Sequence, residues 1–159
     1  ASGILNGLVE LRAAGIYFHR DIRPANIMIE EGTGRAVIID LGIATTDPDA
    51  LPQHNRRYGG PNDLVSLGQV MYYMATGEHI FAQSESMTRT FTEIADELAD
   101  YKTKVYEDYS GRLLEKHLAE VDRNIKDQRV TDIIKACLTA GKDDHEKIEK
   151  MFKVNHHGS

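Results

Sequence analysis

The segment FHRDIRPANIMI, residues 18–29, places an acid, a cation and an amide within one short stretch of the chain. Asp21 and Asn26 are five residues apart, and Arg23 lies between them. The apolar residues Ile27–Ile29 follow directly and are typical of a short β-strand. We therefore expect a polar loop that ends at a strand, and the flanking sequence indicates which elements hold it.

The stretches on either side of this loop predict a helix and a hairpin. Apolar residues recur at helical spacing over residues 2–14, and Gly15 follows where a helix would stop. On the other side, Ile27–Ile29 and Ala36–Ile39 are separated by EEGTG, which predicts a hairpin turn. The next segment, TTDPDALPQHNRRYGGP at 45–61, has no periodicity, and we expect a long functional or mobile loop.

Residues 62–77, NDLVSLGQVMYYMATG, predict a buried central helix. Asn62 or Asp63 can cap its first turn, and Gly77 can end it. Its apolar residues cover most of the helix circumference, which is typical of a helix buried on all sides. The remaining sequence predicts mostly polar, amphipathic helices near 88–104, 108–121, 128–140 and 143–153.

Composition and charge limit the class of protein. The 159 residues are 41% hydrophobic and 28% charged, which favours one soluble domain with a sizeable core. The net charge of −6 argues against non-specific binding to nucleic acid or to anionic membranes. Charge or glycine interrupts every long apolar stretch, so we expect no membrane span, and no signal peptide is visible. The single cysteine, Cys137, excludes an internal disulfide framework and is compatible with a reducing compartment. We expect a cytoplasmic location, or a host cytoplasm if the protein is a delivered effector.

The candidate chemistry depends on Asp21, Asn26 and Asp40, the last of which ends a β-branched run as IIDLG. Phosphoryl transfer from a nucleotide needs one carboxylate that accepts the proton of the attacking hydroxyl. It also needs oxygen ligands for the Mg²⁺ ions that bridge the phosphates. A nearby cation, here Arg23, can neutralise charge on the transferring group. Each residue alone is common in turns, so the joint pattern carries the interpretation.

These residues lie in motifs that resemble those of eukaryotic-type protein kinases. His-Arg-Asp at 19–21, followed by Asn26, resembles the HRDxxxxN catalytic loop, and Asp-Leu-Gly at 40–42 resembles the DFG motif. The helix at 62–77, with its SLG pattern, is similar to the buried central helix of the kinase large lobe. VTDIIKACL, residues 130–138, is similar to a late helix of that lobe.

The resemblance implies a role for each of five residues. Asp21 would be the catalytic base, and Asn26 and Asp40 would hold Mg²⁺. Met28 would form the floor beneath the adenine of ATP, and Arg23 would neutralise phosphoryl charge. An arginine at the offset of Arg23 occurs in some tyrosine kinases, whereas a proline at the position of Pro24 is typical of Ser/Thr kinases. The hydroxyl specificity therefore stays open.

The resemblance also implies supporting residues. His19 and Leu41 would belong to the regulatory hydrophobic stack, and Asp63 would tether the backbone of the catalytic loop from the central helix. Arg20 and Gly42 complete the same two motifs.

The implied fold is mainly α (α+β): a kinase-like large-lobe helical bundle over residues 1–155, with a small β-hairpin at the cleft and a tail at 156–159. The sequence has no glycine-rich loop, no VAIK-type lysine and no helix with a partner glutamate. These elements form the small lobe of kinases and cover the nucleotide. We therefore expect weak or no ATP binding and negligible turnover from this chain alone.

A second departure from the kinase pattern lies between Asp40 and Asp63, where the segment is short. No glutamate follows Pro61, and AGKDDHEK at 140–147 contains no arginine. The resemblance would place the two halves of a buried ion pair at these positions. Their joint loss is coherent, because one unpaired buried charge would cost several kcal/mol.

The expected function is ATP- and Mg²⁺-dependent phosphoryl transfer to a protein hydroxyl, once a small lobe is supplied. The expected partners are a protein substrate or regulatory protein, and a small lobe or another kinase. One alternative is a pseudokinase or decoy that acts as a protein-binding module. A second is an atypical kinase of the RIO or small-molecule type, which the HRD and SLG patterns disfavour.

Overall fold

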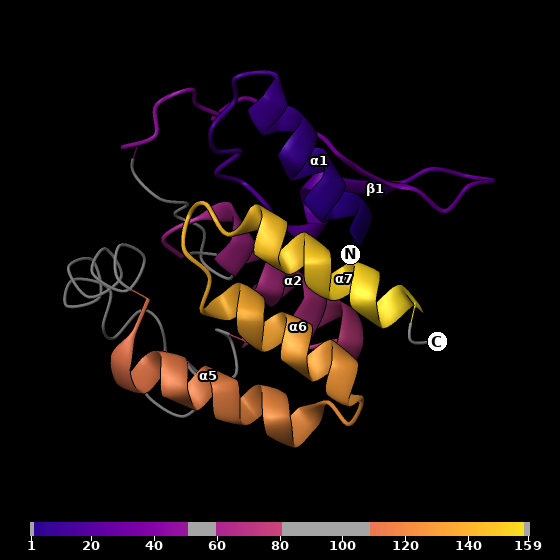
Figure 1. Ribbon diagram of the computed structural model, residues 1–159, viewed down its shortest axis with the longest axis vertical. Coiled ribbons are helices and arrows are strands. Elements are labelled where there is room, and N and C mark those ends of the chain that lie inside the picture. The colour runs from indigo at the N-terminus through magenta and orange to yellow at the C-terminus, as the bar shows by residue number, and fades with distance from the viewer. Residues whose placement is uncertain (1, 51–59, 81–108, 158–159) are drawn as a thin grey trace.

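The computed structural model describes residues 2–50, 60–80 and 109–157. The predicted helix near 88–104 and the middle of the predicted long loop lie outside these residues. In chain order the elements are α1 (Ser2–Ala13), η1 (Pro24–Asn26), β1 (Ile27–Ile29), β2 (Ala36–Ile38), α2 (Asp63–Thr76), α5 (Gly111–Asn124), α6 (Gln128–Leu138) and α7 (His145–His157) (Figure 1). The described part is mainly helical with a small antiparallel sheet, as the sequence predicts.

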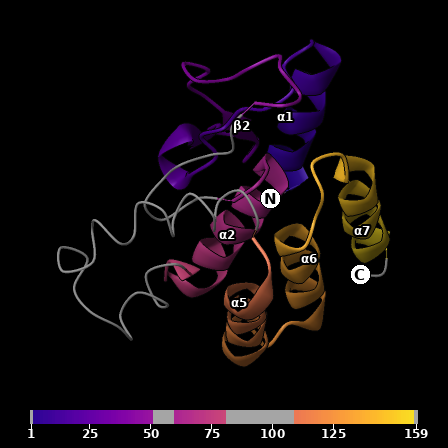
Figure 2. The same ribbon diagram turned by 90° about the vertical axis from the view of Figure 1, so that its left-hand side faces the viewer.

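Helix α1 and the hairpin form one end of the molecule (Figure 2). Strands β1 and β2 pair with Ile27 opposite Ile38, which confirms the predicted hairpin. Helix α1 packs closely on β2 because two of its residues have no side chain. A Cβ atom on Gly7 would lie 2.9 Å from Ile38 Cδ1, and one on Gly3 would lie 3.2 Å from the Cβ of Ala36.

Helix α2 is the central helix, and its predicted caps are confirmed. The Asn62 side chain accepts hydrogen bonds from two backbone N–H groups of the first turn, and Gly77 ends the helix at φ 76°. Every residue from Asp63 to Tyr72 is buried. Burial ends there, and Met74 is 59% exposed, so the apolar pattern overstates the buried length by about one turn.

The remaining helices cover α2 and one another. Helix α6 packs on α2 at Gly68, where a Cβ atom would lie 2.9 Å from the Cβ of Cys137. The predicted apolar stripe of α6 is confirmed, because Ile133, Ile134 and Cys137 are buried. Helix α5 lies beside α6, and α7 contacts both α1 and α6 (Figures 1 and 2).

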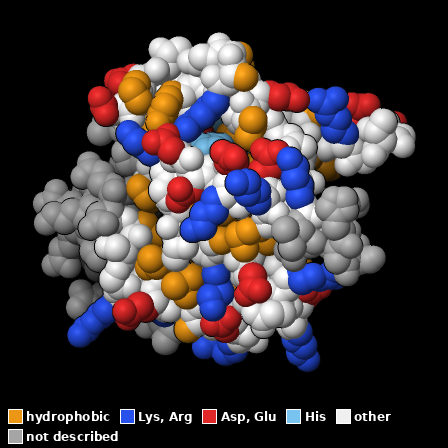
Figure 3. Space-filling view, viewed as in Figure 1, with side chains coloured by type: hydrophobic (Ala, Val, Ile, Leu, Met, Phe, Trp, Pro, Cys, Tyr) orange, Lys and Arg blue, Asp and Glu red, His pale blue; other side chains and the backbone are white. Residues whose placement is uncertain are grey.

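The outer face of this bundle has mixed charge. Figure 3 shows acidic and basic side chains interspersed over the face that α6 and α7 present, with apolar side chains between them. Among the described helices, none has the length and apolar character needed to cross a membrane.

Candidate active site

The loop between α1 and β1 is tied to the start of α2 by Asp63. Its Oδ2 accepts a hydrogen bond from the backbone N–H of His19 at 2.9 Å, and its Oδ1 accepts one from Arg20 at 3.0 Å. Asp63 is only 3% exposed. Burial raises the pKa of this carboxyl group, and the two backbone N–H groups oppose that rise because they stabilise the charged form. Asp63 therefore fixes the first two residues of the HRD motif through their backbone.

His19 links the same loop to the end of the hairpin. Its ring is buried, and Nδ1 accepts a hydrogen bond from the backbone N–H of Asp21 at 3.1 Å. Nε2 lies 2.9 Å from the carbonyl oxygen of Ile39. Because Nδ1 accepts from an N–H group, the ring proton lies on Nε2 and is donated to Ile39. The ring thus joins the Asp21 loop to the residue that precedes Asp40.

Asp21, Arg23 and Asn26 come together as one hydrogen-bonded group. The Asn26 side-chain nitrogen donates to Asp21 Oδ2 at 2.8 Å and to the Asp21 backbone oxygen at 2.9 Å. Arg23 Nε donates to the other carboxylate oxygen, Oδ1, at 3.1 Å. The side chain of Asp21 is 18% exposed and that of Arg23 is 38% exposed. Both carboxylate oxygens are therefore oriented by donors, and Asp21 and Arg23 stay partly accessible to solvent while Asn26 is buried.

Asp40 directly follows Ile39, and the backbone of Ile39 pairs with that of Asn26. The Ile39 N–H donates to the Asn26 backbone oxygen at 2.8 Å, which extends the hairpin ladder by one bond. The Asp40 side chain is exposed, and its Oδ1 accepts a hydrogen bond from the Gly42 N–H at 3.0 Å. The hairpin thus brings Asp40 next to Asn26 along the strand pair.

Two residues of this site have a left-handed backbone conformation. Arg20 has φ 69° and Asp40 has φ 61°, and no other non-glycine residue in the described ranges has a positive φ. Arg20 is further held by its Nε, which donates to the Ile43 carbonyl at 2.7 Å. Such conformations cost about 1–3 kcal/mol each and cluster at functional sites.

Two predicted site residues, Met28 and Leu41, are not packed into the protein. Met28 on β1 is 57% exposed and Leu41 is 48% exposed, whereas His19 is buried. Leu41 lines a groove of 480 Å³ between α1 and β2. These two apolar side chains are open to contact from outside the described residues.

Comparison with known proteins places this geometry in a family context. No protein-family model matches the chain. The chain is 38% identical to Sperm motility kinase 2B of Mus musculus in an alignment of 76 residues that covers 38% of this chain and 16% of that protein. It is 28% identical to Mitogen-activated protein kinase kinase 2 of Arabidopsis thaliana in an alignment of 116 residues that covers 61% of this chain and 31% of that protein. It is also 30% identical to a probable serine/threonine-protein kinase, PknB, of Bifidobacterium longum in an alignment of 113 residues that covers 59% of this chain and 16% of that protein.

The chain is related to the protein kinases. The predicted relationship to this superfamily is therefore confirmed. The described residues, which are mainly helical with a small antiparallel sheet, are compatible with the large lobe of a kinase. The chain spans less than a third of the length of each of the three kinases just named.

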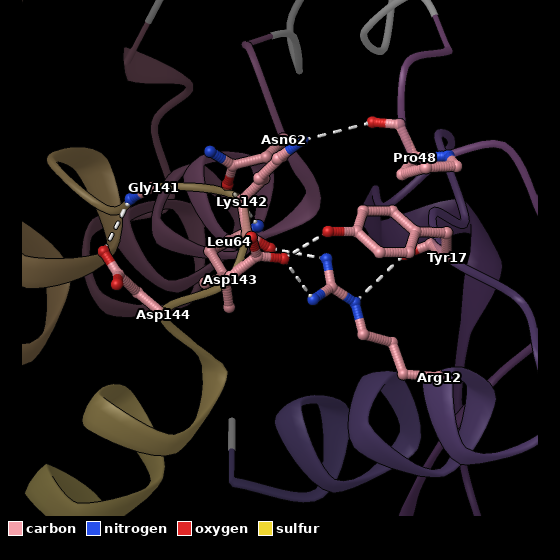
Figure 4. Close-up of polar contacts among 9 residues, drawn as sticks. All are labelled: Arg12, Tyr17, Pro48, Asn62, Leu64, Gly141, Lys142, Asp143 and Asp144. Atoms are coloured by element: carbon pink, nitrogen blue, oxygen red, sulfur yellow. Dashed lines mark hydrogen bonds and ion pairs between the residues drawn. The ribbon is translucent and has the colours of Figure 1, made fainter.

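The structure also contains a polar cluster that the sequence did not predict, close to the candidate site. Arg12 at the end of α1 binds Asp143 in the turn between α6 and α7, with 2.8 Å between Nη1 and Oδ1 (Figure 4). Tyr17 donates its hydroxyl to the same carboxylate oxygen. The turn within 140–147, which contains no arginine of its own, is bound by an arginine from α1. The only signal in the sequence is the basic residue in the last turn of the first helix, which does not identify its partner.

Proposed function

We propose that this chain carries the phosphoryl-transfer site of a protein kinase. The site would use ATP and Mg²⁺ to phosphorylate a protein hydroxyl once a small lobe completes the nucleotide cleft. The observation that carries the proposal is the position of Asn26. Its side chain binds the Asp21 carboxylate at 2.8 Å, and its backbone oxygen accepts the N–H of Ile39 at 2.8 Å. One residue thereby fixes the Asp21 loop relative to the strand that leads into Asp40.

The donor set of the site fits a hard divalent cation. The hydrogen bonds of the Asn26 side chain use its amide nitrogen, so the amide oxygen is available to a cation. The carboxylate of Asp40 is exposed. Mg²⁺ prefers oxygen ligands of these two kinds. Asn26 and Asp40 would hold the ion, which supplies charge neutralisation on the phosphates when it is bound.

Asp21 is oriented as a base would need to be. Asn26 and Arg23 donate to different oxygens of its carboxylate, and each oxygen keeps a further lone pair for the proton of a substrate hydroxyl. Arg23 uses Nε for this contact. The remaining N–H donors of its guanidinium group would neutralise charge on the transferring phosphoryl group.

Exposed apolar side chains on and next to the hairpin favour a partner that covers this surface. Met28 and Ile29 are 57% and 61% exposed, and Leu41 and Ile43 are 48% and 50% exposed. A small lobe would cover this surface in the proposed enzyme. The same exposure favours the alternative function, a protein-binding module without phosphoryl transfer.

Phosphoryl transfer from labelled ATP to a protein substrate separates these two functions. The assay uses this chain joined to a kinase small lobe ahead of Ala1, with the variants Asp21→Asn and Asp40→Asn. We expect each to lower kcat at least about 100-fold, because each removes a charge that acts on the reacting groups. Asp49→Asn, an exposed acid outside the site, serves as the matched control and should keep full activity.

The chain alone is expected to bind Mg-ATP weakly. Nanomolar binding by the isolated chain would show that it needs no small lobe. Unchanged transfer in Asp40→Asn would exclude the kinase mechanism. A fusion that binds a protein partner on the hairpin surface but transfers no phosphate would favour the binding module.

A further inference from the structure

A backbone bridge closes the segment that contains the residues of the candidate site from His19 to Gly42. The N–H groups of Tyr17 and Phe18 donate to the Thr45 carbonyl at 2.8 and 3.2 Å, and the Thr45 N–H donates back to Phe18 at 2.9 Å. Every residue of the site from His19 to Gly42 lies between the two sides of this bridge. The relative position of the Asp21 loop and Asp40 therefore depends on how firmly the bridge is held.

The Arg12 cluster, defined here as Arg12, Tyr17, Lys142 and Asp143, is drawn in Figure 4. It adjoins the bridge through Tyr17, whose backbone N–H donates to the Thr45 carbonyl. Arg12 uses all three guanidinium nitrogens: Nη1 binds Asp143 Oδ1 at 2.8 Å, Nη2 donates to the Lys142 carbonyl at 2.5 Å, and Nε donates to the Tyr17 carbonyl at 3.2 Å. Its guanidinium carbon also lies 4.0 Å from the centre of the Tyr17 ring. The side chain of Arg12 is 20% exposed and that of Asp143 is 61% exposed, so the arginine fork is largely fixed while its carboxylate partner lies at the surface.

The turn between α6 and α7 contacts both sides of the bridge. Asp143 accepts the hydroxyl of Tyr17, the residue that precedes Phe18. Lys142 Nζ lies 3.5 Å from the carbonyl oxygen of Pro48, which follows Thr45 on the other side. Ala140, two residues before Lys142, accepts a hydrogen bond at 2.9 Å from the side chain of Asn62, which caps α2. One short turn thus contacts both flanks of the bridge and the helix that carries Asp63.

From these contacts we propose that Asp143 is a positioning residue of the candidate active site. By binding Arg12 and Tyr17 together, it holds the Phe18–Thr45 bridge and so sets the Asp21 loop and Asp40 relative to each other. This inference rests on the proposed function for its catalytic consequence, but its structural consequence can be measured without any activity. Asp143 itself reaches no atom of the site and acts only through the bridge.

Amide hydrogen exchange of the chain itself tests the structural consequence. In Asp143→Ala, Arg12 and Tyr17 lose their shared acceptor, and we expect exchange at Phe18, Thr45 and Ile39 to accelerate about tenfold. Exchange in the buried part of α2 should stay unchanged, because that helix does not depend on the carboxylate. The ultraviolet titration of Tyr17 gives a second signature. The hydrogen bond to Asp143 raises the pKa of the Tyr17 phenol, and the variant should bring it down.

Asp122→Ala is the matched control, because Asp122 forms an exposed ion pair with Lys135 at 3.1 Å, between α5 and α6. It should leave the exchange of the bridge amides unchanged. Tyr17→Phe removes only the hydroxyl and should accelerate the same amides by a smaller factor, about threefold. If Asp143→Ala does not fold, Tyr17→Phe still tests whether the contact to Asp143 holds the bridge. Unchanged bridge amides in both variants, or acceleration spread equally over α2 and the bridge, would overturn the proposal.

Phosphoryl transfer by the small-lobe fusion tests the catalytic consequence. Asp143→Ala should lower kcat about tenfold with little change in KM, because misplaced groups slow the chemical step. Asp143→Glu keeps the charge and should restore at least half of the activity, which a general packing defect would not do. Full kcat in Asp143→Ala would contradict the positioning role. Absence of transfer even in the unmodified fusion would count against the proposed function, and the exchange data would still decide the inference.

Discussion

The site segment, residues 19–44, and the helical body of α1, α2, α5, α6 and α7 are held by different forces. In the site segment, Ile22 is buried in the core, but Met28 and Ile29 are more than half exposed, and hydrogen bonds to His19 and Asp63 fix the loop that carries Asp21. In the body, residues such as Ile134 are fully buried and order comes from close apolar packing. A site held by a few polar anchors depends on each of them separately, whereas the body distributes its stability over many contacts.

The largest effect is expected from Asp63→Asn, which acts where the two regions meet. An asparagine presents an NH₂ group to one of the two backbone N–H donors that the carboxylate now accepts. One buried N–H group then loses its partner. We expect the free energy of unfolding to fall by about 3 kcal/mol, since an unsatisfied buried donor costs about 1–3 kcal/mol and the close N–H contacts add repulsion. Urea denaturation measures the change.

Asp122→Asn provides the comparison for this acid-to-amide change. Its carboxylate belongs to an exposed pair with Lys135, and exposed pairs contribute at most about 1 kcal/mol. A loss in Asp63→Asn no larger than that in Asp122→Asn would show that the buried anchor is not a distinct element of the fold.

A smaller effect is expected from the pH dependence of the helical body, through His117 on α5. The ring is fully buried and hydrogen-bonded to the Tyr109 hydroxyl. Burial, with a smaller contribution from the charge of Lys116, lowers the pKa of His117 to about 3. In the unfolded chain the ring binds a proton near pH 6.5, as histidines ordinarily do. The stabilisation is therefore complete above about pH 6.5 and is lost as the pH falls toward 3.

Between pH 7 and pH 5 this linkage should cost about 2 kcal/mol of the free energy of unfolding. His117→Gln cannot gain a proton, so its stability should fall less over the same range. His145 titrates in the same direction, because burial lowers its pKa to about 4, and the difference between wild type and His117→Gln isolates His117. Parallel curves for the two proteins would mean that His117 is not the buried base described here.

The sequence predicted elements that have local signals. Gly15 and Gly77 end their helices as expected, and Asn62 caps α2. The hairpin also formed where the β-branched runs and EEGTG predicted it. In each case a few neighbouring residues determine the conformation, so a short window of sequence is sufficient.

Contacts between distant parts of the chain could not be predicted in this way. The bond from Arg12 to Asp143 joins residues 131 positions apart, and no periodicity relates them. The exposed Met74 shows a similar limit, because a helical pattern does not tell where the neighbouring helices end. The exposure of Leu41 likewise depends on what packs beside the hairpin, which its own motif does not encode.

The smallest effect is expected from Ile29→Ala, which tests the comparison with the same residue type in both regions. Ile29 on β1 is 61% exposed and Ile134 on α6 is fully buried. Truncating the exposed side chain should lower the free energy of unfolding by less than about 1 kcal/mol, mostly through lost strand propensity. Ile134→Ala should cost about 3 kcal/mol because it removes buried surface and leaves a cavity.

Guanidinium denaturation of both variants under one condition measures the contrast. A cost for Ile29→Ala close to that for Ile134→Ala would mean that the apolar face of the hairpin is already covered in solution, by a second copy of the chain or by another part of it. A small cost leaves that face uncovered in the free chain, as a surface that receives a small lobe requires. The same substitution in the small-lobe fusion should then become more costly, because the side chain would be buried at the new contact.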